Sequence, residues 1–179
     1  HWMLGMFDPR AQDAVWSKDV NALIASSFIF PAGRARKTKG GHTLSGHWPF
    51  SSGVESSEWN MLAGVVASDD EADGIEYRIF LLHRNDFKIN DTWNATGLCG
   101  TGSNDVKVTD AFVADYMSIA ISDLTGGPTP GSRVNPNALY ALPVFSLFPY
   151  VLSGVGLGNA QACLDDYVEL ARHRASTYN

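Results

Sequence analysis

The stretch that decides the fold spans residues 34–50 and reads RARKTKGGHTLSGHWPF. Gly40-Gly41 is a turn signal between two runs of strand character, so the stretch predicts a β-hairpin with strands at 34–38 and 42–50. Pro49 lacks a backbone N–H donor and suits a strand only at an edge or an irregularity. The second strand is therefore expected to become irregular near its end.

Further strand signals lie on both sides of this hairpin. Each is a β-rich or apolar run bounded by turn-forming residues. The run 59–67 is mostly apolar and suits a central strand. Six or seven strands in sequence, with little helix between them, predict an antiparallel β-sandwich or barrel. Outside the hairpin, the runs span residues 23–30, 59–67, 75–82, 87–93 and 106–113.

Helical patterns mark the two ends of the chain. Residues 9–20 have mixed periodicity, and apolar residues recur at three- and four-residue spacing over 153–175, which leaves one helix face in need of a partner. The stretch between the last strand and this helix is rich in Gly and Pro, as is typical of a connector. We predict the end of a helical domain at 1–20, a β domain at 21–122, a linker at 123–137 and the start of a second helical domain at 138–179.

The composition is that of an ordinary globular protein, with 45% hydrophobic and 18% charged residues and a formal net charge of −6. Lys and Arg are scattered, which argues against nucleic acid or an anionic membrane as a partner. Cys99 and Cys163 lie far apart, and the histidines lack ligand spacing, so neither disulfides nor a metal site is expected. No run approaches the roughly 18 apolar residues of a membrane helix, and no targeting segment is recognised.

We therefore expect a cytoplasmic protein. The start at His1, without an initiator Met, and the end without a helix-stop signal predict that the chain is a piece of a longer protein.

The run at 46–53 is the most unusual segment of the chain. Trp48 and Phe50 flank Pro49, and two hydroxyls follow at Ser51 and Ser52. A flat apolar wall beside short hydrogen-bonding groups is what an isoalloxazine ring requires. On the residues alone, the alternative is a strand end followed by a Ser-Ser-Gly turn, because Ser and Gly are common turn formers.

Four segments together resemble the acyl-CoA-dehydrogenase-like two-component flavin-dependent monooxygenases, which include the oxygenase components of p-hydroxyphenylacetate hydroxylase and 3-hydroxy-seco-androstatrienedione hydroxylase. The resemblance covers nearly the whole chain. It implies the middle β domain of the acyl-CoA dehydrogenase fold between two helical domains, the second of which forms a homotetramer. The segments are Ala25-Ser26-Ser27, the Trp-x-Phe-Ser-Ser-Gly signature at 48–53, Trp93 with residues 97–106, and the helix 158–174.

This resemblance implies an oxygenase component that receives reduced FMN or FAD from a partner flavin reductase. The flavin reacts with O2 to give a C4a-hydroperoxide, which hydroxylates an aromatic, often phenolic, substrate. Two alternatives stay open: an acyl-CoA dehydrogenase or related flavin oxidase, which shares the fold, and a non-catalytic structural fragment. The run at 48–52 differs from the Trp-Ile-Thr-Asn type of the dehydrogenases.

The resemblance also assigns roles to residues. His1 would accept a phenolic proton, and the Ser51-Ser52 pair would place a hydroxyl near flavin N5, with Ser51 favoured. The remaining cofactor-binding positions would be apolar walls and hydrogen-bonding groups. The walls are Trp48, Phe50 and Trp93, and the hydrogen-bonding positions are Ser26, Ser27 and Thr101.

Three positions depart from the family pattern. Relatives commonly carry Arg and Phe around Ala141 and Val144, and Arg at the position of Cys99. Ala and Val cannot reproduce the charge or the ring, so these differences bear on flavin affinity and on the choice between FMN and FAD. Because the family completes its flavin site with the last helical domain and a neighbouring subunit, we expect little turnover from this chain by itself.

Overall fold

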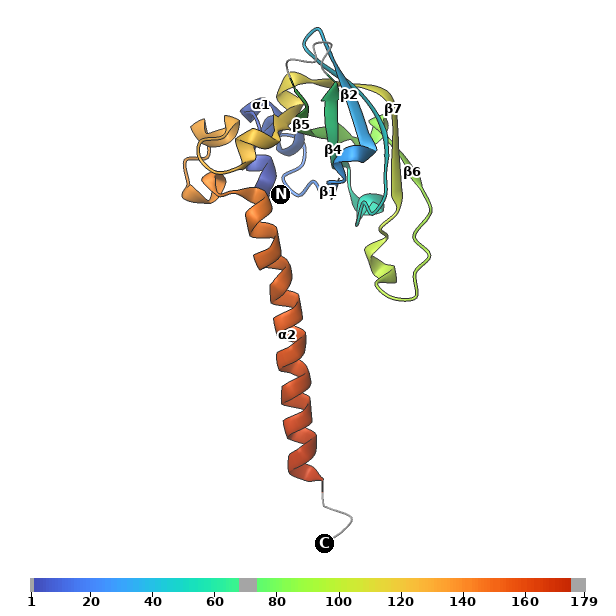
Figure 1. Ribbon diagram of the computed structural model, residues 1–179, viewed down its shortest axis with the longest axis vertical. Helices are drawn as coiled ribbons and strands as arrows, with labels where there is room; N and C mark the ends of the chain where they lie inside the picture. Colours follow the sequence, from blue (N-terminus) through green and yellow to red (C-terminus); the bar gives the residue numbers. More distant parts are fainter. Residues whose placement is uncertain (1, 68–73, 175–179) are drawn as a thin grey trace. The chain divides into compact units, whose positions relative to one another are not determined.

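A computed structural model describes residues 2–67 and 74–174. The chain divides into two compact units, His1–Leu142 and Pro143–Asn179. The first unit is a twisted sheet with short helices, and the second is dominated by one long helix, α2 (Figure 1). The predicted β-rich fold with a following helix is thereby confirmed.

The strands that the structure describes form one eight-stranded sheet with the order β6-β7-β3-β2-β4-β5-β8, and β1 also pairs with β4. The predicted hairpin is confirmed: β2 and β3 pair antiparallel from Gly33↔Gly46 to Thr38↔Gly41. Gly40 takes a φ of 78° at the turn, which glycine adopts without strain. The strands are β1 Ile24–Ser27, β2 Gly33–Thr38, β3 Gly41–Trp48, β4 Trp59–Ala67, β5 Glu76–His83, β6 Lys88–Asn90, β7 Asp105–Ala114 and β8 Ser118–Ala120.

The sheet is mixed, whereas the sequence predicted purely antiparallel pairing. β1 runs parallel to the first half of β4, from Ile24↔Trp59 to Ser27↔Leu62. β2 runs parallel to the second half, from Arg34↔Val65 to Arg36↔Ala67. The break at Phe30–Ala32 therefore interrupts the chain without reversing it, so β1 and β2 follow one another along β4 in the same direction.

Two α-helices and several 3₁₀ turns complete the described part of the chain. Asp8 caps the first helix by accepting a hydrogen bond from the backbone N–H of Arg10, and Pro9 starts it, as is usual for the first helical position. The α-helices are α1 Pro9–Trp16 and α2 Val144–His173, and the 3₁₀ turns are η1 Trp2–Met6, η2 Phe30–Ala32, η3 Val54–Ser56, η5 Arg84–Asp86, η6 Cys99–Thr101, η7 Asp115–Met117, η8 Ile121–Leu124, η9 Pro130–Arg133 and η10 Ala138–Ala141.

Trp48 lies at the centre of the core of the first unit. Its side chain is fully buried, and its indole Nε1–H donates a 2.6 Å hydrogen bond to the carbonyl of Ala63. Gly33 and Gly46 make room for the ring, because a Cβ at either position would lie 2.3 or 2.5 Å from an indole carbon. A buried tryptophan with a satisfied N–H anchors the interior of the sheet, so Trp48 has a structural role here, and its predicted contact with a flavin stays a prediction.

Candidate functional site

The end of β3, the end of β1 and the loop that precedes β7 meet at one place. Ser26 of β1 forms an isolated antiparallel bridge with Ser52. The backbone N–H of Gly53 donates to the carbonyl of Thr101 at 2.7 Å. The sequence singled out these three segments separately, and the fold brings them together. We call the group formed by Ser26, Phe50, Ser52, Trp93, Thr101 and Ser103 the Phe50 rim.

Phe50 is turned outward by its backbone. Its φ is 60°, a left-handed conformation that costs a non-glycine residue on the order of 1 kcal/mol. The side chain is 59% exposed, two residues after the buried Trp48. Trp93 packs edge-to-face on the Phe50 ring, with 6.2 Å between the ring centroids. The strained backbone and the exposed aromatic ring make this position a candidate binding surface.

The neighbouring serines have opposite environments. Ser51 is 0% exposed, and its Oγ accepts a 2.9 Å hydrogen bond from Nδ2 of Asn60 on β4. Ser52 is exposed, and its Oγ lies 2.7 Å from the Oγ of Ser103. Ser51 therefore faces the interior, and Ser52 presents its hydroxyl at the Phe50 rim.

The hydroxyl of Ser52 belongs to a short chain of hydroxyl groups. Ser103 Oγ is also 2.7 Å from Thr101 Oγ1, and Thr101 Oγ1 donates to the carbonyl of Leu98 at 2.9 Å. The same carbonyl accepts the indole N–H of Trp93 at 3.0 Å. Leu98 itself has a φ of 55°. One carbonyl thus holds both the hydroxyl chain and the ring that supports Phe50.

Asn104 holds the loop against the sheet, although no role was predicted for it. Its side chain is 3% exposed, and its Oδ1 accepts hydrogen bonds from the backbone N–H groups of Thr92 and Trp93 at 3.0 and 2.9 Å. Its Nδ2 donates to Oε1 of Glu55 at 2.8 Å. The signal that could have found it is its place directly after Gly102-Ser103, since asparagine side chains often satisfy backbone groups in turns.

The other predicted positions lie at different depths. Ser27 is buried, and its hydroxyl donates to the carbonyl of Pro49 at 2.7 Å, whereas Ser26 is half-buried. Ser27 thus ties β1 to the segment before Phe50. His1 lies outside the described residues, so its predicted role stays a prediction.

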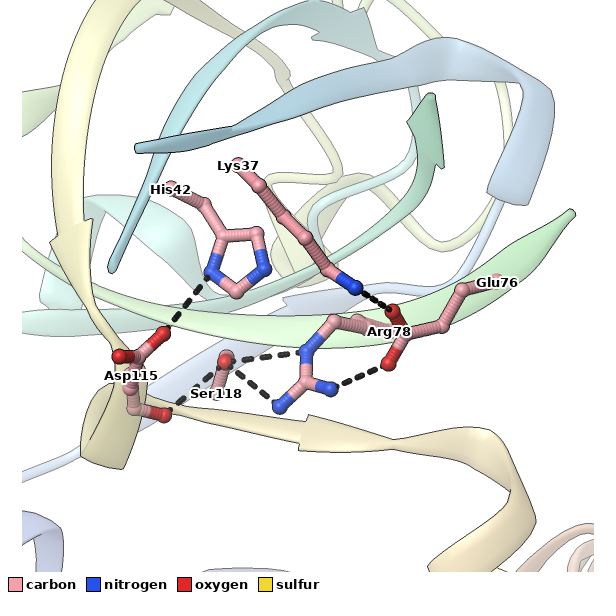
Figure 2. Close-up of polar contacts among 6 residues, drawn as sticks. All are labelled: Lys37, His42, Glu76, Arg78, Asp115 and Ser118. Carbon is pink, nitrogen blue, oxygen red and sulfur yellow. Dashed lines mark hydrogen bonds and ion pairs between the residues drawn. The ribbon is translucent and has the colours of Figure 1, made fainter. Parts of the chain in front are cut away.

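A second polar cluster lies at the start of β3, at the strand's other end (Figure 2). Arg78 donates to the Oγ of Ser118 from two nitrogens, at 3.1 and 3.0 Å, and is paired with Glu76. His42 is 3% exposed and packs edge-to-face on Phe80. We call Lys37, His42, Glu76, Arg78, Asp115 and Ser118 the His42 cluster.

His42 is neutral in this cluster. Burial lowers its pKa below 6.5, and the positive charge of Arg78 adds to that effect. Its Nδ1 lies 3.7 Å from Asp115 Oδ1, which is too long for a hydrogen bond, and neither ring nitrogen has a hydrogen-bond partner among the residues that the structure describes. The contact with Asp115 is therefore not an ion pair, and the cluster is a structural feature of the sheet.

Residues 2–67 and 74–174 contain no group of three or more His, Cys, Asp or Glu side chains that could hold a metal ion. Within the same ranges, no helix is long and apolar enough to cross a membrane.

Curated relatives match nearly all of this chain. HsaA from Rhodococcus jostii, the oxygenase subunit of a flavin-dependent monooxygenase, is 34% identical over 94% of this chain and 44% of its own length. The oxygenase component of an FADH2-dependent resorcinol hydroxylase from Rhizobium is 35% identical over 94% of this chain and 41% of its own length. The oxygenase component of p-hydroxyphenylacetate 3-hydroxylase from Acinetobacter baumannii is 30% identical over 98% of this chain and 41% of its own length. The chain thus spans less than half the length of these relatives.

Solved structures of similar proteins also match nearly all of this chain. The crystal structure of 3-HSA hydroxylase from Rhodococcus sp. RHA1 matches with a TM-score of 0.88 at 34% identity, over 98% of this chain and 46% of that one. XiaF from Streptomyces, in complex with FADH2 and glycerol, matches with a TM-score of 0.77 at 26% identity, over 99% of this chain and 44% of that one. No family model matches the chain.

Proposed function

We propose that this chain forms the flavin-binding β part of an aromatic hydroxylase. The chain belongs to the family of flavin-dependent monooxygenase oxygenase subunits. Within the longer protein, residues 1–20 would end the first helical domain, 21–122 would be the β domain, 123–137 a linker, and 138–179 would start the second helical domain. The whole protein would be a cytoplasmic homotetramer.

The observation that carries this proposal is the exposed ring of Phe50 beside the exposed hydroxyl of Ser52. A flavin presents a flat apolar face together with a polar edge. The Phe50 rim offers a matching pair: an aromatic ring exposed at a residue with strained backbone, and the hydroxyl of Ser52 two residues further along the chain. The described residues therefore fit the group, and reduced FMN or FAD is the proposed cofactor.

Each residue of the rim has a distinct proposed task. Phe50 and Trp93 would cover the flavin and keep water from it, because a dry site protects a reactive flavin. Ser52 would hold the flavin edge at N5, and it replaces Ser51 as the favoured hydroxyl because Ser51 is buried and bonded to Asn60. The bound reduced flavin would activate O2 and supply one oxygen atom to the substrate ring.

The names of the relatives support the proposed partners. The Rhizobium relative is FADH2-dependent and, as an oxygenase component, is named as one part of a larger system. A flavin reductase that supplies reduced flavin is therefore the proposed protein partner, and an aromatic compound and O2 are the proposed substrates. His1 is proposed as the group that accepts a phenolic proton, because a neutral imidazole can take a proton near neutral pH.

The experiment that tests this function supplies the full-length protein with chemically reduced FMN or FAD, ¹⁸O₂ and a panel of phenols. We expect a hydroxylated product that carries one ¹⁸O atom. Ser52→Ala should lower its yield, whereas Ser56→Ala, at another exposed serine, should not. No labelled product with either flavin, together with flavin reduction by an acyl-CoA, would instead favour the dehydrogenase alternative.

A further inference from the structure

The hydroxyl groups of Ser52, Ser103 and Thr101 form a chain that ends on a carbonyl oxygen. The two oxygen–oxygen distances between hydroxyls are both 2.7 Å, and the last step, from Thr101 Oγ1 to the carbonyl of Leu98, is 2.9 Å. Ser103, in the middle of this chain, is 6% exposed, whereas Thr101 is half-buried and Ser52 is exposed. Ser52 is the member of the chain that lies nearest to Phe50 in the sequence and faces the Phe50 rim.

The carbonyl of Leu98 accepts from the backbone N–H of Thr101, from the indole N–H of Trp93 and from Thr101 Oγ1, and the donation from Thr101 Oγ1 sets the direction of the two bonds between hydroxyls. A carbonyl oxygen can only accept, and each hydroxyl has one hydrogen to donate. Thr101 gives its hydrogen to Leu98, so it can only accept from Ser103. Ser103 has then given its hydrogen, so it can only accept from Ser52. The hydrogen of Ser52 therefore points inward, and its oxygen turns lone pairs toward the rim.

An oxygen with that orientation distinguishes the two redox states of a flavin. Reduced flavin carries a hydrogen on N5 and is a donor there, whereas N5 of oxidised flavin has no hydrogen and is an acceptor. When Ser52 donates its hydrogen inward, its oxygen can accept the N5 hydrogen of reduced flavin. In oxidised flavin, N5 is also an acceptor, so the oxygen of Ser52 and N5 cannot form a hydrogen bond. Burying two polar groups without a hydrogen-bond partner costs more free energy than one hydrogen bond contributes on average, so oxidised flavin should bind more weakly.

We infer that Thr101 and Ser103 are positioning residues that make Ser52 a hydrogen-bond acceptor and thereby give the site its preference for reduced over oxidised flavin. This inference rests on the proposed function, since it assumes that flavin N5 meets Ser52. Neither residue needs to touch the flavin. Their effect passes through the polarity of the hydroxyl chain.

The test measures the Kd of reduced FMN, under anaerobic conditions, and of oxidised FMN with the full-length protein. Thr101→Val removes the donation to Leu98 and lets Ser103 donate toward Ser52, so the hydrogen of Ser52 can turn outward. Ser103→Ala frees Ser52 directly. In both variants we expect the ratio of oxidised to reduced Kd to fall roughly tenfold, the size of one hydrogen bond.

Two control variants preserve the hydroxyl chain: one retains the hydroxyl at residue 101, and the other changes a threonine outside the chain. Thr101→Ser retains the hydroxyl and should keep the wild-type ratio. Thr125→Val removes a threonine hydroxyl that also donates to the carbonyl three residues earlier, at 2.8 Å to Ser122, and it should leave the ratio unchanged. If Thr101→Val does not fold, Ser103→Ala and Thr101→Ser carry the comparison.

The outcomes separate this inference from the proposed function. An unchanged ratio in both variants, or an equal loss of affinity for both redox states, would mean that the chain has a purely structural role, and the inference would be wrong. A wild-type protein that binds neither form of FMN nor of FAD would overturn the proposed function, and the inference with it.

Discussion

Ser51 and Ser52 are neighbours in the chain, but one has a structural role and the other a proposed role in binding. The side chain of Ser51 points to Asn60 in the interior, and that of Ser52 points to Ser103 at the Phe50 rim. The chain turns tightly here, because the backbone N–H of Ser52 donates to the carbonyl of Phe50 at 3.0 Å, and the two hydroxyls therefore meet different partners. The two substitutions to alanine should therefore fail in different ways.

Ser51→Ala should destabilise the fold by about 1–3 kcal/mol, because it leaves the buried Nδ2 of Asn60 without its acceptor. Ser52→Ala should change the free energy of unfolding by less than about 0.5 kcal/mol, as is usual at exposed positions, while it weakens the binding of reduced flavin. Urea unfolding and anaerobic flavin titration measure the two effects. Equal losses of stability in both variants would contradict the division of roles.

His42 should make stability depend on pH. Burial and the charge of Arg78 lower its pKa in the folded state, so the unfolded chain binds a proton first as the pH falls. The stabilisation is complete above pH 6.5, the unfolded value, and is lost as the pH drops below it, by at most about 1.4 kcal/mol per unit for one group. Lys37, Glu76 and Asp115 complete the charged groups around the ring.

Unfolding of the wild type and of His42→Phe between pH 7 and 5.5 tests this dependence. The variant should have a shallower slope, because it lacks the titrating group. His83→Gln, which removes a half-buried imidazole at the end of β5 where it packs on Trp59, serves as the matched control. A slope that is the same in wild type and His42→Phe would assign the effect to other groups.

At the residue scale, the sequence indicated several residues that the fold brings together, but not the direction in which their side chains point. The resemblance selected Ser26, Ser52 and Thr101, and the fold brings these residues together. It did not foresee the left-handed backbone of Phe50, since nothing local to a Pro-Phe-Ser sequence requires it. Which serine faces inward depends on contacts with β4 and with the loop before β7, and such contacts are not encoded in the short motif itself.

At the scale of elements, the loop that precedes β7 is the part of the site with the least regular structure. Its conformation is fixed by Asn104, whose Oδ1 accepts from two successive backbone N–H groups and whose Nδ2 donates to Glu55. Asn104 holds the backbone of Trp93, and the carbonyl of Leu98 holds its indole, so both contacts support the ring that packs on Phe50. The loop should therefore be sensitive to a change at residue 104.

Asn104→Ala should cost about 2–3 kcal/mol of stability, because it leaves the N–H groups of Thr92 and Trp93 without an acceptor. It should also weaken flavin binding by releasing Trp93. Asn94→Ala, at an exposed position in the same loop, is the control and should affect neither quantity by much. Thermal unfolding and Trp fluorescence follow both effects. Wild-type stability in Asn104→Ala would refute the role of this residue.

The predicted elements were most accurate where the hydrophobic pattern was strong. The run 59–67 coincides with β4, and the Gly40-Gly41 hairpin is present. β8, with three residues, was missed because so short a run carries no period. α2 begins at Val144, earlier than predicted, because Pro149 in its interior masks the helical pattern. The parallel pairing of β1 and β2 with β4 depends on long-range contacts.

At the scale of the whole molecule, the second unit exposes the apolar side chains of its long helix. Tyr150, Leu157 and Leu170 are each at least 70% exposed. A helix of this kind gains stability mainly from packing of its apolar face. In the proposed full-length protein, the remaining helices of the last domain and the neighbouring subunits would provide that packing.

A peptide with the sequence of residues 144–174 should accordingly have low helicity in water. Gly154, Gly156 and Gly158 each disfavour a helix by about 1 kcal/mol relative to alanine, and Pro149 by about 3 kcal/mol. Circular dichroism measures this, and a peptide with alanine at the three glycines should be more helical. A strongly helical, monomeric wild-type peptide would contradict the view that α2 needs partners.

A crystal structure of the full-length protein, grown anaerobically with reduced FMN or FAD, would show whether the Phe50 rim binds reduced flavin. We expect the isoalloxazine to lie against the ring of Phe50, with N5 at a hydrogen-bonding distance of about 2.7–3.2 Å from the Oγ of Ser52. A flavin bound elsewhere, or one that Ser51 contacts while Ser52 does not, would contradict this expectation.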